Sequence, residues 1–95
     1  MDTNFTADEK RPLGVSVLTP IGPFPNDDDY RRAFSNERIK KILDKVKDAQ
    51  HITDAKDWVA KVDGRQIDPE KTFHEEGLRC VVEIEWHKVE GGGGA

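Results

Sequence analysis

The sequence has one cysteine, few aromatic residues and no long apolar run within its 95 residues. A single cysteine, Cys80, cannot form an internal disulfide, which excludes the cross-linked framework of small secreted domains. No apolar segment approaches the roughly 18 residues that a membrane span requires. No basic start followed by an apolar stretch marks a secretory signal. We therefore expect a cytoplasmic protein with no membrane among its partners.

Neither sign of charge is in large excess, since the chain has 15 Lys+Arg and 19 Asp+Glu and a formal net charge of −4. Nucleic acids and anionic membranes attract basic surfaces, so this mild acidity argues against both as the main partner. A chain of this length builds one hydrophobic core. We expect one folded domain that acts as a monomer.

The first residues of the chain are polar, and a regular alternation of apolar and polar residues begins after them. Residues 1–12 show no hydrophobic period, so we predict a flexible arm there. Apolar residues then recur at every second position and predict a strand over residues 13–19. A Pro-rich connection and a second strand over residues 30–34 complete an irregular hairpin. The residues that we place on one face of this second strand are Tyr30, Arg32 and Phe34.

One amphipathic helix is predicted over residues 36–50, where apolar side chains recur at helical spacings. We expect Ser35 to be its N-cap, since a serine hydroxyl accepts hydrogen bonds from N–H groups of the first turn. Phe34 and Ile39 occupy the positions of a hydrophobic staple. A single apolar stripe must lie on a flat surface, which a sheet provides. The stripe consists of Ile39, Ile42, Leu43 and Val46.

The second half of the chain continues with short strands. Apolar and polar residues alternate over residues 58–62, and Asp63-Gly64 is a tight-turn signal. A very short strand is expected after the turn, at residues 65–67. Because the strands and the single helix must share one core, we predict an α+β fold. It is a mixed sheet of four or five strands with one amphipathic helix across one face.

The final segment predicts a turn and a long strand. Thr72 is expected to cap a brief helical turn, with Phe73 packed inward. The last strand has one apolar and one mostly charged face, and the apolar face is formed by Cys80, Val82, Ile84 and Trp86. We interpret Cys80 as a small hydrophobic residue of the core, not as a nucleophile.

Residues 64–78 resemble ubiquitin, and the two sequences align there without a gap. Gly64, Gln66 and Thr72 match. Residues similar in kind are Arg65, Ile67, Asp68, Phe73, Glu75 and Leu78. The preceding strand, the single helix and a last strand that runs into glycines follow the same order. On this resemblance the chain is identified as a β-grasp, ubiquitin-like protein. It is similar in kind to the modifiers of bacterial ubiquitination-like operons.

The resemblance implies a protein modifier with a β-grasp domain over residues 13–90 and a flexible glycine tail over residues 91–95. A processing peptidase would expose Gly94 by removing Ala95, or would cut after Gly92. An activating enzyme would then adenylate the terminal glycine with ATP and magnesium, and a conjugating enzyme would lead to an isopeptide bond with a target protein. Glycine has no Cβ, so such a tail can thread a narrow enzyme channel. The residues assigned to processing and conjugation are Gly91, Gly92, Gly93, Gly94 and Ala95.

Departures from ubiquitin imply dedicated partner enzymes. The residues before the glycines stand where ubiquitin is arginine-rich, so an activating enzyme tuned to arginines should bind this tail poorly. Lys61 stands where ubiquitin has an apolar residue at the centre of its recognition patch, so ordinary ubiquitin receptors should not recognise it. The residues assigned to partner binding are Lys61, His87, Lys88, Val89 and Glu90.

Two alternatives share the same fold. One is a sulfur carrier that holds a C-terminal thiocarboxylate, and the other is a non-covalent binding module with an inert tail. We expect no catalysis by the chain itself, because no nucleophile and base are paired in the sequence. We also expect no cofactor and no metal, since His51, His74 and His87 fall in separate segments without ligand spacing.

Overall fold

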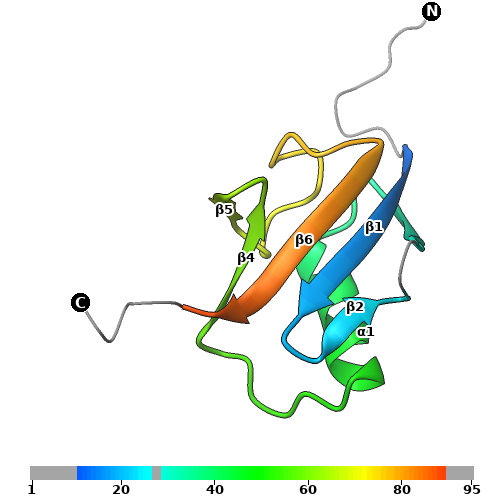
Figure 1. Ribbon diagram of the computed structural model, residues 1–95. Coiled ribbons are helices and arrows are strands. Elements are labelled where there is room, and N and C mark those ends of the chain that lie inside the picture. Colours follow the sequence, from blue (N-terminus) through cyan, green and yellow to red (C-terminus); the bar gives the residue numbers. More distant parts are fainter. Residues whose placement is uncertain (1–10, 27–28, 90–95) are drawn as a thin grey trace, which may run out of the picture.

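The computed structural model describes residues 11–26 and 29–89 and shows one mixed sheet with one helix across it (Figure 1). The predicted α+β, β-grasp class is confirmed. The sheet has six strands because the Pro-rich connection contains an additional short one. The elements are β1 (Pro12–Thr19), β2 (Gly22–Phe24), β3 (Arg31–Phe34), α1 (Ile39–Ala49), β4 (Trp58–Val62), β5 (Arg65–Ile67) and β6 (Val81–Lys88).

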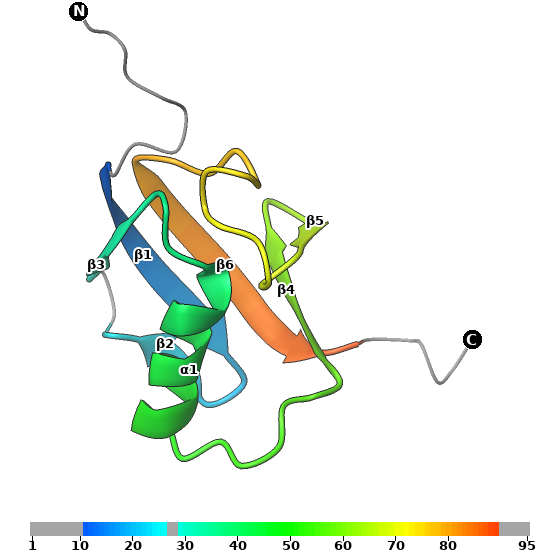
Figure 2. The ribbon, with the colours of Figure 1, turned by 180° about the vertical axis from the view of Figure 1, so that it is seen from behind.

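The two long strands form the centre of the sheet, whose order is β2-β1-β6-β4-β5, with β3 also paired to β1. β1 and β6 run parallel, from Gly14 opposite Val81 to Leu18 opposite Glu85. The predicted inward alternation of β1 is confirmed, since Leu13, Val15 and Val17 are buried. α1 covers this inward face (Figure 2).

β1 begins one residue earlier than predicted. Pro12 already pairs with Phe34, and Arg11 is bonded to Ser35 through both backbone groups. The N–H of Arg11 donates to Ser35 Oγ at 3.0 Å, and the N–H of Ser35 donates to the carbonyl of Arg11 at 2.8 Å. Most of the predicted arm lies on residues 1–10, outside the described residues.

In the hairpin's second strand, Arg32 and Phe34 share one face as predicted, and it is the face opposite to the core. In β3 the buried residue is Ala33, while Arg31 and Arg32 are exposed. Ala33 lies opposite Leu13 in the antiparallel pair, and opposite residues share a face of the sheet. Since Leu13 points into the core, Ala33 must do so too. The core therefore takes the small residue of this strand.

The helix starts at Ile39, later than predicted, and Ser35 is not its N-cap. Arg38 occupies the cap position and makes no side-chain cap bond. The first N–H groups of α1 instead bind carbonyls of the β5–β6 loop: Ile39 donates to Lys71 and Lys40 donates to Pro69, each at 2.9 Å. These bonds satisfy the unpaired N–H groups of the first turn. The predicted apolar stripe is confirmed, because all of its residues are buried.

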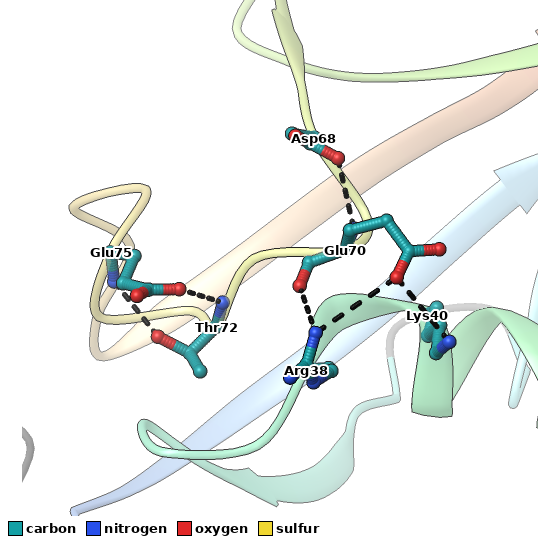
Figure 3. Close-up of polar contacts among 6 residues, drawn as sticks. All are labelled: Arg38, Lys40, Asp68, Glu70, Thr72 and Glu75. Atoms are coloured by element: carbon teal, nitrogen blue, oxygen red, sulfur yellow. Dashed lines mark hydrogen bonds and ion pairs between the residues drawn. The ribbon is translucent and has the colours of Figure 1, made fainter.

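The β5–β6 loop is fastened to this end of the helix (Figure 3). Arg38 Nη1 donates to the carbonyl of Glu70 at 2.9 Å, and Lys40 Nζ lies 3.4 Å from the Glu70 carboxylate. Thr72 and Glu75 form the reciprocal bonds of a capping box, at 2.9 and 3.0 Å. The predicted turn at Thr72 and the inward position of Phe73 are therefore confirmed, since Phe73 is 1% exposed.

The prediction for Cys80 was wrong. Cys80 is exposed and precedes β6, whose inward residues are Val82, Ile84 and Trp86. Its φ of +66° places it in the left-handed region, which breaks the alternation of an extended strand. Its backbone is used all the same, because the carbonyl of Cys80 accepts a hydrogen bond from the N–H of Gly14 at 2.9 Å.

A carboxylate on the same loop is held by two hydrogen bonds. The N–H of Asp68 donates to Glu76 Oε2 at 2.9 Å, and Arg65 Nη1 donates to Glu76 Oε1 at 2.9 Å. Both favour the ionised form, and the Asp68 bond has the larger effect on the pKa of Glu76. Together they hold this pKa below its ordinary value of 4.5.

This lowered pKa gives a testable pH dependence. A carboxyl group with a lower pKa in the folded state stabilises the fold above its unfolded-state pKa. That stabilisation is lost as the pH falls through the folded-state pKa. We therefore expect the wild-type free energy of unfolding to decrease below pH 4.5, and Glu76→Gln to reduce this decrease. Urea unfolding over a pH series measures both. Equal pH slopes for the wild type and Glu76→Gln would contradict the prediction, and Glu85→Gln at an exposed carboxylate is the matched control.

Candidate functional site

The residues predicted to bind partners lie at the end of β6 and on the strand beside it. β6 pairs with β4 so that Lys61 lies opposite Glu85, Val59 opposite His87 and Trp58 opposite Lys88. Lys61 and His87 are thus diagonal neighbours on adjacent strands. The structure brings these two predicted residues onto one face of the sheet, about half-buried each.

This outer face is turned away from α1 (Figures 1 and 2). Side chains of a strand alternate between faces, and the inward positions of β6 are buried. Its outward positions carry the exposed carboxylates Glu83 and Glu85 beside His87. Tyr30 Oη donates to Glu83 Oε2 at 3.1 Å. The charged face predicted for the last strand is confirmed.

Apolar residues on the outer face are scattered and do not form one patch. Leu18 on β1 is 52% exposed and Val81 at the start of β6 is 57% exposed. They lie at opposite ends of the parallel pair, since Leu18 is opposite Glu85 and Val81 is opposite Gly14. A partner that binds this face therefore meets carboxylates and Lys61 at its centre. Sequence alternation could have identified Glu83 and Glu85 as members of the site.

Two tryptophans, one on β6 and one on the neighbouring strand β4, pack against each other near the end of β6. The rings of Trp58 and Trp86 meet edge to face, with centroids 5.0 Å apart and an interplanar angle of 73°. Trp86 is buried, and the buried indole Nε1 of Trp58 has no hydrogen-bond partner among residues 11–26 and 29–89. Trp58 pairs with Lys88, so this aromatic contact lies at the point where β6 ends.

The last described residues lead toward the glycines. Nδ1 of His87 lies 2.8 Å from the carbonyl of Lys88, a contact in which a protonated Nδ1 donates. Lys88 and Val89 are exposed, and Val89 is the first residue beyond β6. The other predicted site residues lie outside the described residues: Glu90, Gly91, Gly92, Gly93, Gly94 and Ala95.

Groups that could support catalysis or metal binding are dispersed. No cluster of three His, Cys, Asp or Glu residues suited to a metal ion occurs within the described part of the chain. Among the hydrogen bonds between described residues, none joins the Cys80 thiol to a histidine. In the same residues, no helix combines the length and apolar character needed to cross a membrane.

Comparisons with known proteins identify the fold. No protein-family model matches the sequence, and no curated protein matches it. A protein designed on the basis of ubiquitin is 18% identical and has a TM-score of 0.64, with 88% of this chain and 96% of the designed chain covered. The ubiquitin-like domain of the Arabidopsis thaliana protein At2g32350 is 20% identical, with a TM-score of 0.61 and coverage of 90% and 85%.

A third solved structure has the same architecture. The N-terminal ubiquitin-like domain of the 4931431F19Rik protein is 16% identical, with a TM-score of 0.54 and coverage of 90% of this chain and 83% of that domain. At such low identities the likeness establishes the fold and nothing further.

Proposed function

We propose that this chain, which has the ubiquitin-like β-grasp fold, is a protein modifier joined to targets through a glycine of its tail. One observation carries the proposal. The central strand β6 ends at Lys88, the exposed Val89 follows, and one residue later the sequence enters the run from Gly91 to Gly94. A rigid domain that passes within two residues into glycines suits an enzyme that reads the domain and acts on the tail.

The proposed reaction uses the tail as an acyl group. A peptidase hydrolyses the bond after Gly94 and releases Ala95, or it hydrolyses the bond after Gly92. The exposed carboxylate attacks ATP at an activating enzyme, which forms an acyl adenylate and releases diphosphate. An enzyme thiolate displaces AMP, and an amine of the target then displaces the thiolate to form the amide. The chain supplies the acyl group and its partners supply the catalysis.

Selectivity in this proposal comes from the outer face as well as from the tail. Glu83 and Glu85 are exposed on the strand that leads to the glycines, with Lys61 beside them. An enzyme that receives this tail needs cationic groups opposite the two carboxylates. Lys88 and Val89, which are exposed at the end of β6, would be read at the mouth of its channel. These features favour dedicated enzymes over those of ubiquitin.

Mass spectrometry tests the proposal directly. The chain is tagged at its N-terminus, expressed with its native neighbouring genes and digested with trypsin, which cleaves after Lys88. Conjugation through Gly94 leaves the six-residue remnant Val-Glu-Gly-Gly-Gly-Gly on a target lysine, whereas conjugation through Gly92 leaves the four-residue Val-Glu-Gly-Gly. We expect the longer remnant. A chain that ends at Glu90 keeps the trypsin site and is the matched control, in which both remnants should be absent.

Other outcomes of this measurement separate the alternatives. A tail in which sulfur replaces one carboxylate oxygen, without remnants on other proteins, would support the sulfur carrier and overturn the modifier. An unprocessed tail without remnants, in cells that express the neighbouring genes, would also overturn it and leave the binding module.

A further inference from the structure

A cavity lies at the end of the sheet where the parallel strands β1 and β6 begin (Figure 1). It is enclosed between the start of β1 and the end of the β5–β6 loop, and we call it the Arg79 cavity. Its volume is about 740 Å³, within the range of about 300–1,000 Å³ that small-molecule sites have. β6 ends at the opposite end of the sheet, so the cavity does not include the point where the chain enters the glycines. The residues that define the cavity are Arg11, Leu13, Ser35, His74, Leu78 and Arg79.

The two walls of the cavity are joined by backbone hydrogen bonds. The N–H of His74 donates to the carbonyl of Ser35 at 2.9 Å, and the N–H of Gly14 donates to the carbonyl of Cys80 at 2.9 Å. These bonds link the loop to the start of α1 on one side and to β1 on the other. The cavity is therefore built by the fold itself, as small-molecule sites usually are.

The lining of the cavity is cationic although the chain as a whole is acidic. Arg11 belongs to one wall, and Arg79 and His74 belong to the other. Among the described residues that line the cavity, none carries a carboxylate. The carboxylates on the same loop are already bonded elsewhere, Glu75 in its capping box and Glu76 to Arg65 and Asp68. An excess of positive charge therefore faces the cavity.

The loop wall also holds hydrogen-bond donors that no other part of the described chain uses. The side chains of Arg79 and His74 form no hydrogen bond or ion pair with another described residue. The backbone N–H groups of Arg79 and Cys80 have no acceptor among residues 11–26 and 29–89. A guanidinium, an imidazole and two N–H groups are therefore available to an anion.

The charge and the volume of the cavity favour a phosphate monoester over a carboxylate. One arginine is enough to satisfy a planar carboxylate. A phosphate monoester has three terminal oxygens and a charge of about −1.5 to −2 at pH 7, which suits two guanidinium groups on facing walls. A phosphate alone would fill little of the volume. The rest is lined by Pro12, Leu13 and Leu78, which an apolar organic body can contact.

We propose that the Arg79 cavity binds a small phosphate monoester of the size of a nucleoside monophosphate. Its phosphate accepts hydrogen bonds from Arg79 and His74, with the positive charge of Arg11 on the facing wall. Its organic body lies against Pro12 and Leu78. The site includes neither the tail nor the outer face, so this non-covalent binding is independent of the proposed conjugation.

A defined ligand pair tests the site on the purified full chain. The probe is adenosine 5′-monophosphate, and the comparison ligand is adenosine, which lacks the phosphate. We expect the monophosphate to shift the amide NMR signals of Gly77, Arg79 and Cys80 and to bind about tenfold or more tightly than adenosine, with an affinity that falls as salt is added. Arg79→Gln should weaken this binding by about tenfold or more. Arg31→Gln removes the same charge from β3, outside the cavity, and should change binding by less than about twofold.

The one cysteine of the chain gives a second readout. Cys80 is exposed and lines the cavity. Saturating adenosine 5′-monophosphate should slow alkylation of its thiol by iodoacetamide, because a bound ligand covers the wall. At the same ligand concentration, this protection should be much smaller in Arg79→Gln and unchanged in Arg31→Gln. Equal alkylation rates with and without the ligand in the wild type would contradict the proposed site.

Several results would overturn the proposal. They are equal binding of the monophosphate and adenosine, equal binding by the two variants, or shifts confined to residues outside the cavity. Inorganic phosphate that binds as tightly as the monophosphate would show a simple anion site and would overturn it as well. Tighter binding of the peptide acetyl-Ala-phosphoserine-Ala-amide would assign the cavity to a phosphate carried by a protein and not by a small molecule. Far-UV circular dichroism verifies that Arg79→Gln, a change at an exposed residue, leaves the fold intact.

Discussion

Phe73→Ala is expected to lower the free energy of unfolding by about 3–5 kcal/mol, the range for removal of a fully buried aromatic side chain. Phe73 is 1% exposed and lies where the β5–β6 loop meets the start of the helix. Its N–H donates to the carbonyl of Glu37 at 3.2 Å, and its carbonyl accepts from Leu78 at 2.9 Å. Loss of the ring leaves these backbone hydrogen bonds in place but creates a cavity in the core where the loop packs.

This loss is large relative to the whole stability. A chain of this length has a free energy of unfolding of about 5–14 kcal/mol. Urea unfolding followed by tryptophan fluorescence measures the change, because Trp58 and Trp86 are in the core region. Val81→Ala, at a residue 57% exposed, should change the free energy by no more than about 0.5 kcal/mol. A Phe73→Ala protein that unfolds at the wild-type urea concentration would contradict the assigned role of this ring.

Gly93→Ala together with Gly94→Ala is expected to lower the abundance of conjugates by about a hundredfold. A displacement of about 1 Å at a reacting centre is enough for such a loss. The reason is steric: each added Cβ narrows the approach of catalytic groups to the backbone and restricts its torsions. The measurement is the amount of the six-residue tryptic remnant of each protein, which is Val-Glu-Gly-Gly-Ala-Ala in the double variant, relative to total tagged protein.

The control makes the same change further from the acyl carbon. Gly91→Ala adds one Cβ three residues before Gly94 and should reduce the remnant much less. The midpoint of urea unfolding should be the same for all three proteins, since the tail follows the last strand. Wild-type remnant levels in the double variant would contradict the view that the glycines are needed for their narrow backbone.

The sequence predicted correctly those elements whose buried face follows from a local period of apolar residues. The alternation at Leu13, Val15 and Val17 and the helical stripe from Ile39 to Val46 lie on the core side as expected. A period of two or 3.6 is specified within a few residues, so no distant contact is required to read it.

The predictions that failed depend on distant backbone contacts or on unusual torsions. The start of the helix is satisfied by carbonyls of Pro69 and Lys71, which lie some thirty residues further along the chain and carry no capping signature. The positive φ of Cys80 is invisible to a pattern of apolar residues.

The candidate site was predictable in composition and only partly in arrangement. Alternation placed His87 and Lys61 on outward positions, but their diagonal placement depends on the register of β4 against β6. A groove lined by Arg31 of β3 and Lys45 of α1 could not be predicted, because these residues come together only when the strand and the helix are packed. Electrostatic patches of this kind are properties of the fold and not of a sequence window.

The central place of β6 has a mechanical consequence. β6 is hydrogen-bonded to β1 on one side and to β4 on the other, and it runs parallel to β1. The two ends of the domain therefore leave the sheet in opposite directions along neighbouring strands (Figure 1). Tension applied between them shears many hydrogen bonds of the β1–β6 pair together instead of peeling them one after another. An enzyme that unfolds the domain by pulling on its two ends would therefore have to break these hydrogen bonds together. A pull on a side chain within the domain would load a different set of contacts.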